Sequence, residues 1–168
     1  MIFTTYTINN YTTFATENNR TIKTFRLMLH INNTSREIAK YTENAKVALK
    51  NGCQWIQLRK QESTDDEFVH VAASIKELCD KYHAYLIIED QVHVAKQVKA
   101  NGVHLTNQSA ICEARKELGA RYLICVDAND SKEASRFHAM GADCINGADL
   151  GYKMFEMVVT SSEQLAYA

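Results

Sequence analysis

The sequence predicts an α/β protein in which short strands and helices alternate along one chain. From Leu27 onward, apolar runs typical of buried strands recur about every 17 to 30 residues. The segments between them carry apolar residues at the 3.6-residue spacing of a helix that packs on one face. Strands separated by helices imply right-handed crossovers and a parallel sheet. Because 168 residues suffice for one core and are few for two, we expect a single domain.

The predicted strands are short and contain mostly apolar residues. They comprise residues 27–31, 55–59, 84–88, 102–105, 122–126 and 142–145. The run at 84–88 is apolar throughout, as a strand covered on both faces has to be. About six strand-helix units are therefore expected.

Capping signals predict where the helices begin. Thr34 with Glu37 and Thr64 with Glu67 match the capping box, and Asp130 stands three residues before Glu133. The segment after Thr64 gives the clearest helical stripe, formed by Phe68, Val71, Ala72, Ile75, Leu78, Cys79 and Tyr82. Shorter helices are predicted around 94–98 and from a cap at Ser109 to Gly119, and glycines at 52, 119 and 141 are predicted helix ends.

The chain divides into three parts that differ in composition and periodicity. Residues 1–26 are dense in Thr and Asn, which compete for local backbone hydrogen bonds, so we expect an irregular leader. Residues 27–151 form the predicted barrel domain, and residues 152–168 form a divergent tail in which 155–159 has the composition of a seventh strand. Synthesis from Met28 is an alternative that would omit the leader. An incomplete barrel leaves a sheet edge, which we expect the leader, a second copy or a partner chain to cover.

Composition excludes several classes of function. The formal net charge is −1 and no basic stripe is present, so nucleic acid is not an expected partner. The five cysteines form no CxxC pair, which favours reduced thiols over disulfides or zinc. No apolar run is long enough to cross a membrane and no signal-peptide core is present, so we expect a cytoplasmic protein without a membrane partner.

Two architectures satisfy a parallel sheet with alternating helices. An open doubly wound sheet usually has a glycine-rich turn after its first strand, and Asn32-Asn33-Thr34 is not one. A closed barrel gathers its chemistry at the carboxyl ends of the strands, where this sequence places Arg59, Asp90 and Asp127. The sequence therefore favours a parallel (β/α)8 TIM barrel, incomplete at about six units.

Two strand ends carry residues suited to a phosphorylated ligand. Gln57, Arg59 and Lys60 provide an amide and two cations, which can hold a diphosphate through charge-assisted hydrogen bonds. Glu89 and Asp90 provide carboxylate oxygens, which could hold Mg²⁺ against that diphosphate.

These segments resemble the thiamine phosphate synthase and TenI family of (β/α)8 barrels. The family's QLR-plus-lysine motif resembles Gln57-Leu58-Arg59-Lys60, its Asn-Asp strand end resembles Ile88-Glu89-Asp90, and its GVHL strand matches residues 102–105. The order of the three motifs is also shared, and the resemblance runs from about residue 27 to 143.

The resemblance implies a transferase that joins aminopyrimidine methyl diphosphate to thiazole phosphate and releases pyrophosphate. Arg59 and Lys60 would be catalytic and would hold the pyrophosphate, with Gln57 and Glu89 also binding substrate. Asp90 would hold the Mg²⁺ cofactor, with Glu89 as a further candidate ligand. The implied partners are therefore small phosphorylated molecules.

The sequence departs from the family pattern at several places, and these leave other readings open. Gln61 stands where the family has its lysine, Glu89 replaces an Asn, and Ser109 replaces a metal-binding Asp. The family's phosphate-binding loops after the last two strands have no counterpart after Asp143. The catalytic set is thus incomplete, and the alternatives are a non-catalytic or truncated remnant that binds a phosphorylated ligand and, third, a TenI-type thiazole tautomerase.

Several of these polar residues also have a purely structural interpretation. Asp90 and Ser109 can be helix caps, His104 a hydrogen-bonded core residue and Asp127 a loop residue.

Overall fold

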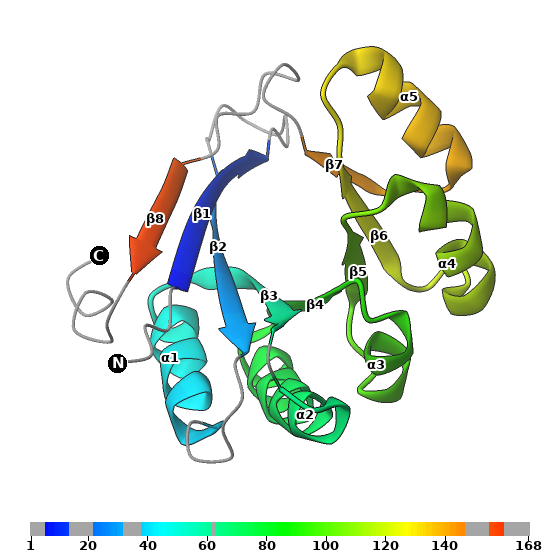
Figure 1. Cartoon of the computed structure of the whole chain (residues 1–168). Coiled ribbons are helices and arrows are strands. Elements are labelled where there is room, and N and C mark those ends of the chain that lie inside the picture. The colour runs from blue at the N-terminus through cyan, green and yellow to red at the C-terminus, as the bar shows by residue number, and fades with distance from the viewer. Residues whose placement is uncertain (1–5, 14–21, 32–37, 62, 147–154, 160–168) are drawn as a thin grey trace.

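In this computed structural model, the described residues are 6–13, 22–31, 38–61, 63–146 and 155–159, and side chains are described for 39–61 and 63–146. They form one eight-stranded sheet in the order β7-β6-β5-β4-β3-β2-β1-β8. The sheet is curved, and the helices lie along its outer face (Figure 1). The predicted Thr34–Glu37 capping box lies outside the described residues.

Six neighbouring strands of the sheet, β2 to β7, run parallel to one another. Along the chain they alternate with helices. The strands are β2 (Ile22–Ile31), β3 (Cys53–Lys60), β4 (Tyr85–Glu89), β5 (Gly102–Leu105), β6 (Leu123–Asp127) and β7 (Cys144–Asn146). The helices are α1 (Ile38–Lys50), α2 (Asp65–Tyr82), α3 (Val92–Gln97), the 3-10 turn η1 (Gln108–Ala110), α4 (Ile111–Leu118) and α5 (Ser131–Met140). This arrangement confirms the incomplete parallel barrel that the sequence predicts.

The core lies between the outer face of the sheet and the helices. Alternate strand residues such as Ile56, Leu58 and Leu86 pack there against α2 residues such as Phe68 and Ile75, and all five are fully buried. Helix α2 begins at a capping box in which Thr64 accepts from the Glu67 backbone and the Glu67 side chain accepts from Thr64, as predicted. None of the described helices is long and apolar enough to span a bilayer.

The prediction of an irregular leader over residues 1–26 is wrong for the part that the structure describes. Strand β1 (Tyr6–Thr13) lies inside this segment, and β2 begins at Ile22, upstream of the predicted start at Leu27. The β-branched and aromatic residues of β1, including Tyr6, Ile8 and Tyr11, favour an extended strand once a partner edge is available. Pairing with β2 supplies the backbone hydrogen bonds for which Thr and Asn side chains would otherwise compete.

The predicted seventh strand at residues 155–159 is present as β8 (Phe155–Val159). It does not extend the sheet beyond β7; it pairs antiparallel with β1, which in turn pairs antiparallel with β2. The leader thus covers the β2 edge, one of the outcomes expected for an incomplete barrel.

Candidate functional site

The candidate site lies at the carboxyl ends of the parallel strands, on the face of the sheet opposite the helices. Side chains alternate between faces along a strand, so Gln57 and Arg59 share one face of β3 while Ile56 and Leu58 pack toward the helices. The same alternation places Glu89 of β4 on the face of Gln57 and Arg59, because Gln57 is in register with Ile87, two residues earlier. Polar side chains from neighbouring strands therefore meet at one rim.

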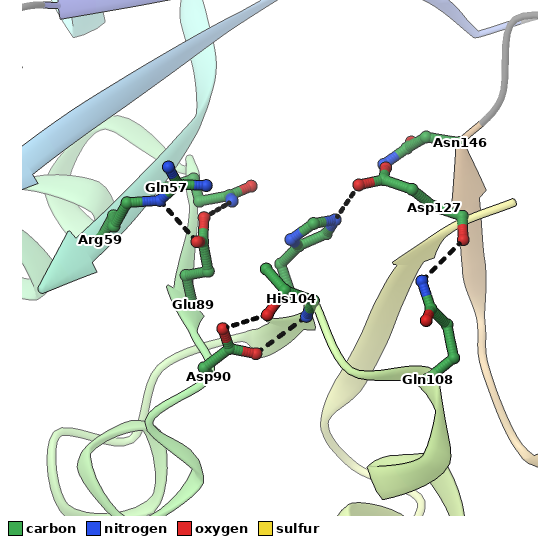
Figure 2. Close-up of polar contacts among 9 residues, drawn as sticks. Gln57, Arg59, Glu89, Asp90, His104, Gln108, Asp127 and Asn146 are labelled. Atoms are coloured by element: carbon green, nitrogen blue, oxygen red, sulfur yellow. Dashed lines mark hydrogen bonds and ion pairs between the residues drawn. The ribbon is translucent and has the colours of Figure 1, made fainter.

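Gln57, Arg59 and Glu89 form the central cluster (Figure 2). Glu89 Oε2 accepts a hydrogen bond of 2.8 Å from Gln57 Nε2, and Glu89 Oε1 accepts one of 2.5 Å from Arg59 Nε. Glu89 is 5% exposed and Gln57 is fully buried, whereas the Arg59 side chain is 39% exposed. The guanidinium therefore lies at the border between the buried carboxylate and solvent.

One atom of this cluster remains available to a ligand. Gln57 Oε1 is buried and has no hydrogen-bond partner within the described part of the chain. A buried acceptor without a partner costs roughly 1–3 kcal/mol, so a ligand that donates to it gains affinity.

The structure does not bring Lys60 to the cluster. The side chain follows the strand alternation to the other face and its Nζ pairs with the Asp65 carboxylate in the first turn of α2. This hydrogen bond and the ammonium charge lower the pKa of Asp65. A role for Lys60 in holding pyrophosphate stays a prediction.

Asp90 follows β4 and closes the turn toward β5. Its backbone has φ of +56° and its N–H donates to His104 O at 3.0 Å. Its carboxylate accepts from the backbone N of Thr106 at 2.8 Å and from Thr106 Oγ1 at 2.5 Å. In this structure Asp90 braces the loops after β4 and β5, and it does not cap α3, whose N-cap is Gln91 without a side-chain bond.

The donors at this rim fit Mg²⁺ only as an ion shared with a ligand. No set of three or more His, Cys, Asp or Glu side chains in the described residues lies close enough to hold a metal. Each Asp90 oxygen keeps a free lone pair beside its hydrogen bond, and Mg²⁺ often binds one or two carboxylates with phosphate oxygens and waters completing its shell. Asp90 fits this role, whereas Glu89 is held by Arg59 and Gln57.

A second polar group flanks the cluster, and the sequence did not predict the pairing of its residues. His104 of β5 is in register with Glu89, and its Nε2 lies 3.3 Å from Asp127 Oδ2, while Asp127 Oδ1 accepts from Asn146 Nδ2 at 3.1 Å (Figure 2). Gln108 Nε2 donates to the Asp127 backbone oxygen at 3.3 Å. His104 is buried, as predicted, but within the described residues neither of its ring nitrogens meets the geometry of a hydrogen bond, so the predicted hydrogen-bonded state is not observed. Asp127 ends β6 instead of lying in a loop. The strand alternation of β5 and β6 was the signal that could have found this pair.

Gly102 sets the spacing between β5 and β6 on this side of the rim, and Ser109 lies in the turn that follows β5. A Cβ atom at Gly102 would lie 2.3 Å from the Leu123 backbone oxygen, so the close approach of β5 to β6 requires glycine. Ser109 donates its N–H and its hydroxyl to Asn107 Oδ1, and Asn107 is the N-cap of η1. The prediction that Ser109 caps the following helix is wrong, because the N-cap of α4 is Ala110, which makes no side-chain hydrogen bond. Ser109 instead lines a separate cleft of about 450 Å³ against α5.

A curved parallel sheet with outer helices and polar side chains at its carboxyl ends defines the class of (β/α) barrel proteins, whose chemistry takes place at that rim. Residues 28–148 match the family described as thiamine monophosphate synthase, and the chain belongs to this family.

Individual relatives agree with this assignment. The chain is 42% identical over 104 residues to a thiamine-phosphate synthase of Bacteroides fragilis, a match that covers 61% of this chain and 51% of that protein. It is 32% identical over 111 residues to one of Clostridium novyi, covering 66% of this chain and 53% of that protein. A solved structure of thiamine phosphate pyrophosphorylase from Pyrococcus furiosus is similar with a TM-score of 0.60 and 26% identity, covering 71% of this chain and 58% of that one. The chain thus spans about half the length of the curated relatives it matches.

Proposed function

We propose that the chain acts in thiamine biosynthesis as a thiamine-phosphate synthase. In this reaction the bond between the pyrimidine methylene carbon and the diphosphate breaks, pyrophosphate leaves with the electron pair, and the thiazole nitrogen forms the new bond to carbon. The observation that carries the proposal is the cluster of Gln57, Arg59 and Glu89 at the strand ends of a chain of this family. Cytoplasmic location is part of the proposal.

Each residue has a role that follows from its position. The Nη groups of Arg59 would donate to a diphosphate oxygen, since Glu89 accepts from Nε and the Arg59 side chain is partly exposed. Gln57 Oε1 would accept from a donor on the substrate. Mg²⁺ held by Asp90 would offset the charge of the departing diphosphate.

A second candidate function is non-catalytic binding of a diphosphate. One observation favours it: Arg59 is paired with the buried Glu89, which leaves less of its charge to stabilise a departing diphosphate during turnover. Binding and turnover therefore have to be measured separately.

The test measures thiamine phosphate formed by the purified chain from both substrates with Mg²⁺, beside pyrophosphate binding by calorimetry. We expect Arg59→Gln to lower turnover by about 10²–10³-fold, the usual cost of losing one donor to a developing negative charge. Lys60→Gln, with Lys76→Gln as a matched control, tests the predicted role of Lys60, because each lysine pairs with an acid on α2. Arg59-dependent binding without product would favour the second candidate, and binding unaffected by Arg59→Gln would refute both.

A further inference from the structure

We propose that Glu89 is a specificity-determining residue that competes with the ligand's diphosphate for Arg59, so that the site takes a diphosphate complexed with a divalent cation in preference to the free anion. This inference rests on the proposed function, because it concerns the same cluster.

The geometry shows that Glu89 already occupies an anion position. Its carboxylate accepts one hydrogen bond from Gln57 Nε2 and one from Arg59 Nε, and these are the amide and cation that the sequence assigns to the substrate. A carboxylate with two such donors resembles a bound phosphate oxygen pair in charge and in contacts. A ligand anion at Arg59 therefore meets a negative group that is covalently part of the protein.

The charge balance of the rim strengthens this competition. Within the region whose side chains are described, Arg59 faces the rim with Glu89, Asp90 and Asp127, and Lys60 is directed to Asp65. Arg59 and Glu89 cancel, so the cluster offers a free diphosphate little net attraction. A divalent cation between the Asp90 carboxylate and the diphosphate reverses this, since it is attracted by both.

Burial makes the effect of Glu89 larger than that of a surface charge. With 5% of the residue exposed, its charge is screened by little solvent, while Arg59 keeps contact with water. The pair also fixes the guanidinium, and the opposing role is that Glu89 only orients Arg59 for the ligand. The two roles predict opposite effects of removing the charge.

The experiment titrates inorganic pyrophosphate into the full chain by calorimetry, with and without Mg²⁺, for the wild type, Glu89→Gln, Arg59→Gln and the double variant. Glu89→Gln keeps the shape and removes the charge. We expect it to tighten binding of metal-free pyrophosphate by about tenfold or more and to change binding with Mg²⁺ much less. The double variant should lose this gain, because the gain requires Arg59.

Control variants test whether the change in affinity is specific to Glu89 and whether each variant is folded. Asp80→Asn removes one exposed carboxylate that pairs with Lys76 on α2, and it should leave both affinities unchanged. Glu89→Asp keeps the charge on a side chain one methylene shorter, and it should give an intermediate gain even if Glu89→Gln proves too unstable to titrate. Thermal unfolding of each variant verifies that it is folded.

Unchanged or weaker metal-free binding by both Glu89 variants, with binding still dependent on Arg59, would overturn this inference and leave the proposed function standing; Glu89 would then be a positioning residue. Binding that depends on neither Arg59 nor Glu89 would overturn the proposed function together with the inference.

Discussion

Cys79 is a thiol enclosed by the core on the inner side of α2. It is fully buried, and this burial, with the nearby Cys53 thiol as a smaller cause, raises its pKa to about 12 from an ordinary value of 9.0. A thiol that cannot ionise in the folded state is chemically inert below strongly alkaline pH.

The raised pKa predicts a loss of stability in alkaline solution. Below pH 9.0 both the folded and the unfolded thiol are protonated, so the full contribution is present; above it the unfolded thiol loses its proton while the folded one keeps it. The free energy of unfolding should then fall by about 1.4 kcal/mol per pH unit from this group. Urea denaturation between neutral pH and about pH 10 should show this slope in the wild type and a smaller slope in Cys79→Ala. Parallel pH curves for the two proteins would contradict the prediction.

At the scale of single residues, sequence reasoning found the cluster but not its pairing. Arg59 and Lys60 are neighbours in the chain with similar chemistry, yet strand alternation sends them to opposite faces. Glu89 was expected at the rim, and its bond to Gln57 depends on the register of β3 with β4, which no local pattern reports. The pairing of His104 with Asp127 was missed for the same reason.

Among the elements, α4 and α5 are joined to the sheet by Arg115. Its guanidinium donates to Gly119 O at 2.6 Å, to Tyr122 O at 2.8 Å and twice to Gly141 O, at 3.2 and 2.8 Å, and it also pairs with the Asp143 carboxylate. These acceptors lie at the carboxyl ends of both helices and beside β6. Arg115 therefore satisfies carbonyls that the helix ends leave without partners.

Replacing Arg115 by Lys should destabilise the chain although the charge is kept. An ammonium cannot reproduce the planar fork that reaches several carbonyls at once. Because these carbonyls belong to half-buried or exposed residues, each lost hydrogen bond costs about 0.5–1.5 kcal/mol. Chemical denaturation should show a lower midpoint with an unchanged slope. Arg121→Lys, at an exposed position nearby, is the matched control and should be near neutral. Equal midpoints for the two variants would show that the fork contributes nothing.

Sequence patterns predicted the elements well where local signals and tertiary packing agree. The capping box at Thr64 and the apolar stripe ending at Tyr82 fixed α2 nearly to the residue. The apolar run before Glu89 likewise gave β4. Strand β1 was missed because its polar, Thr-rich sequence has no amphipathic alternation, and only its pairing with β2 reveals it as a strand.

At the scale of the whole molecule, the directions of β8, β1 and β2 show which strand occupies the edge of the parallel sheet. Strand β8 is antiparallel to β1, and β1 is antiparallel to β2, so β8 runs in the same direction as the six parallel strands. The antiparallel β1 lies between β8 and the first parallel strand. It thereby occupies the edge where a closed parallel barrel would pair its last strand with its first.

A shortened chain that begins at Ile22 should therefore fold poorly and self-associate. It keeps β2 but lacks β1, so the β2 edge loses a partner paired from Tyr6 to Thr13 and β8 loses the strand to which it is bonded. An exposed edge strand is a template for pairing with another copy. We expect a melting temperature lower by about 4 °C or more, which for a chain of this size corresponds to roughly 1–2 kcal/mol. Sedimentation velocity should show dimers or larger species, whereas a chain that begins at Tyr6 and keeps β1 should behave as the full one does. If both shortened chains melt and sediment like the full chain, β1 does not protect the sheet edge, and another segment or a partner chain has to do so.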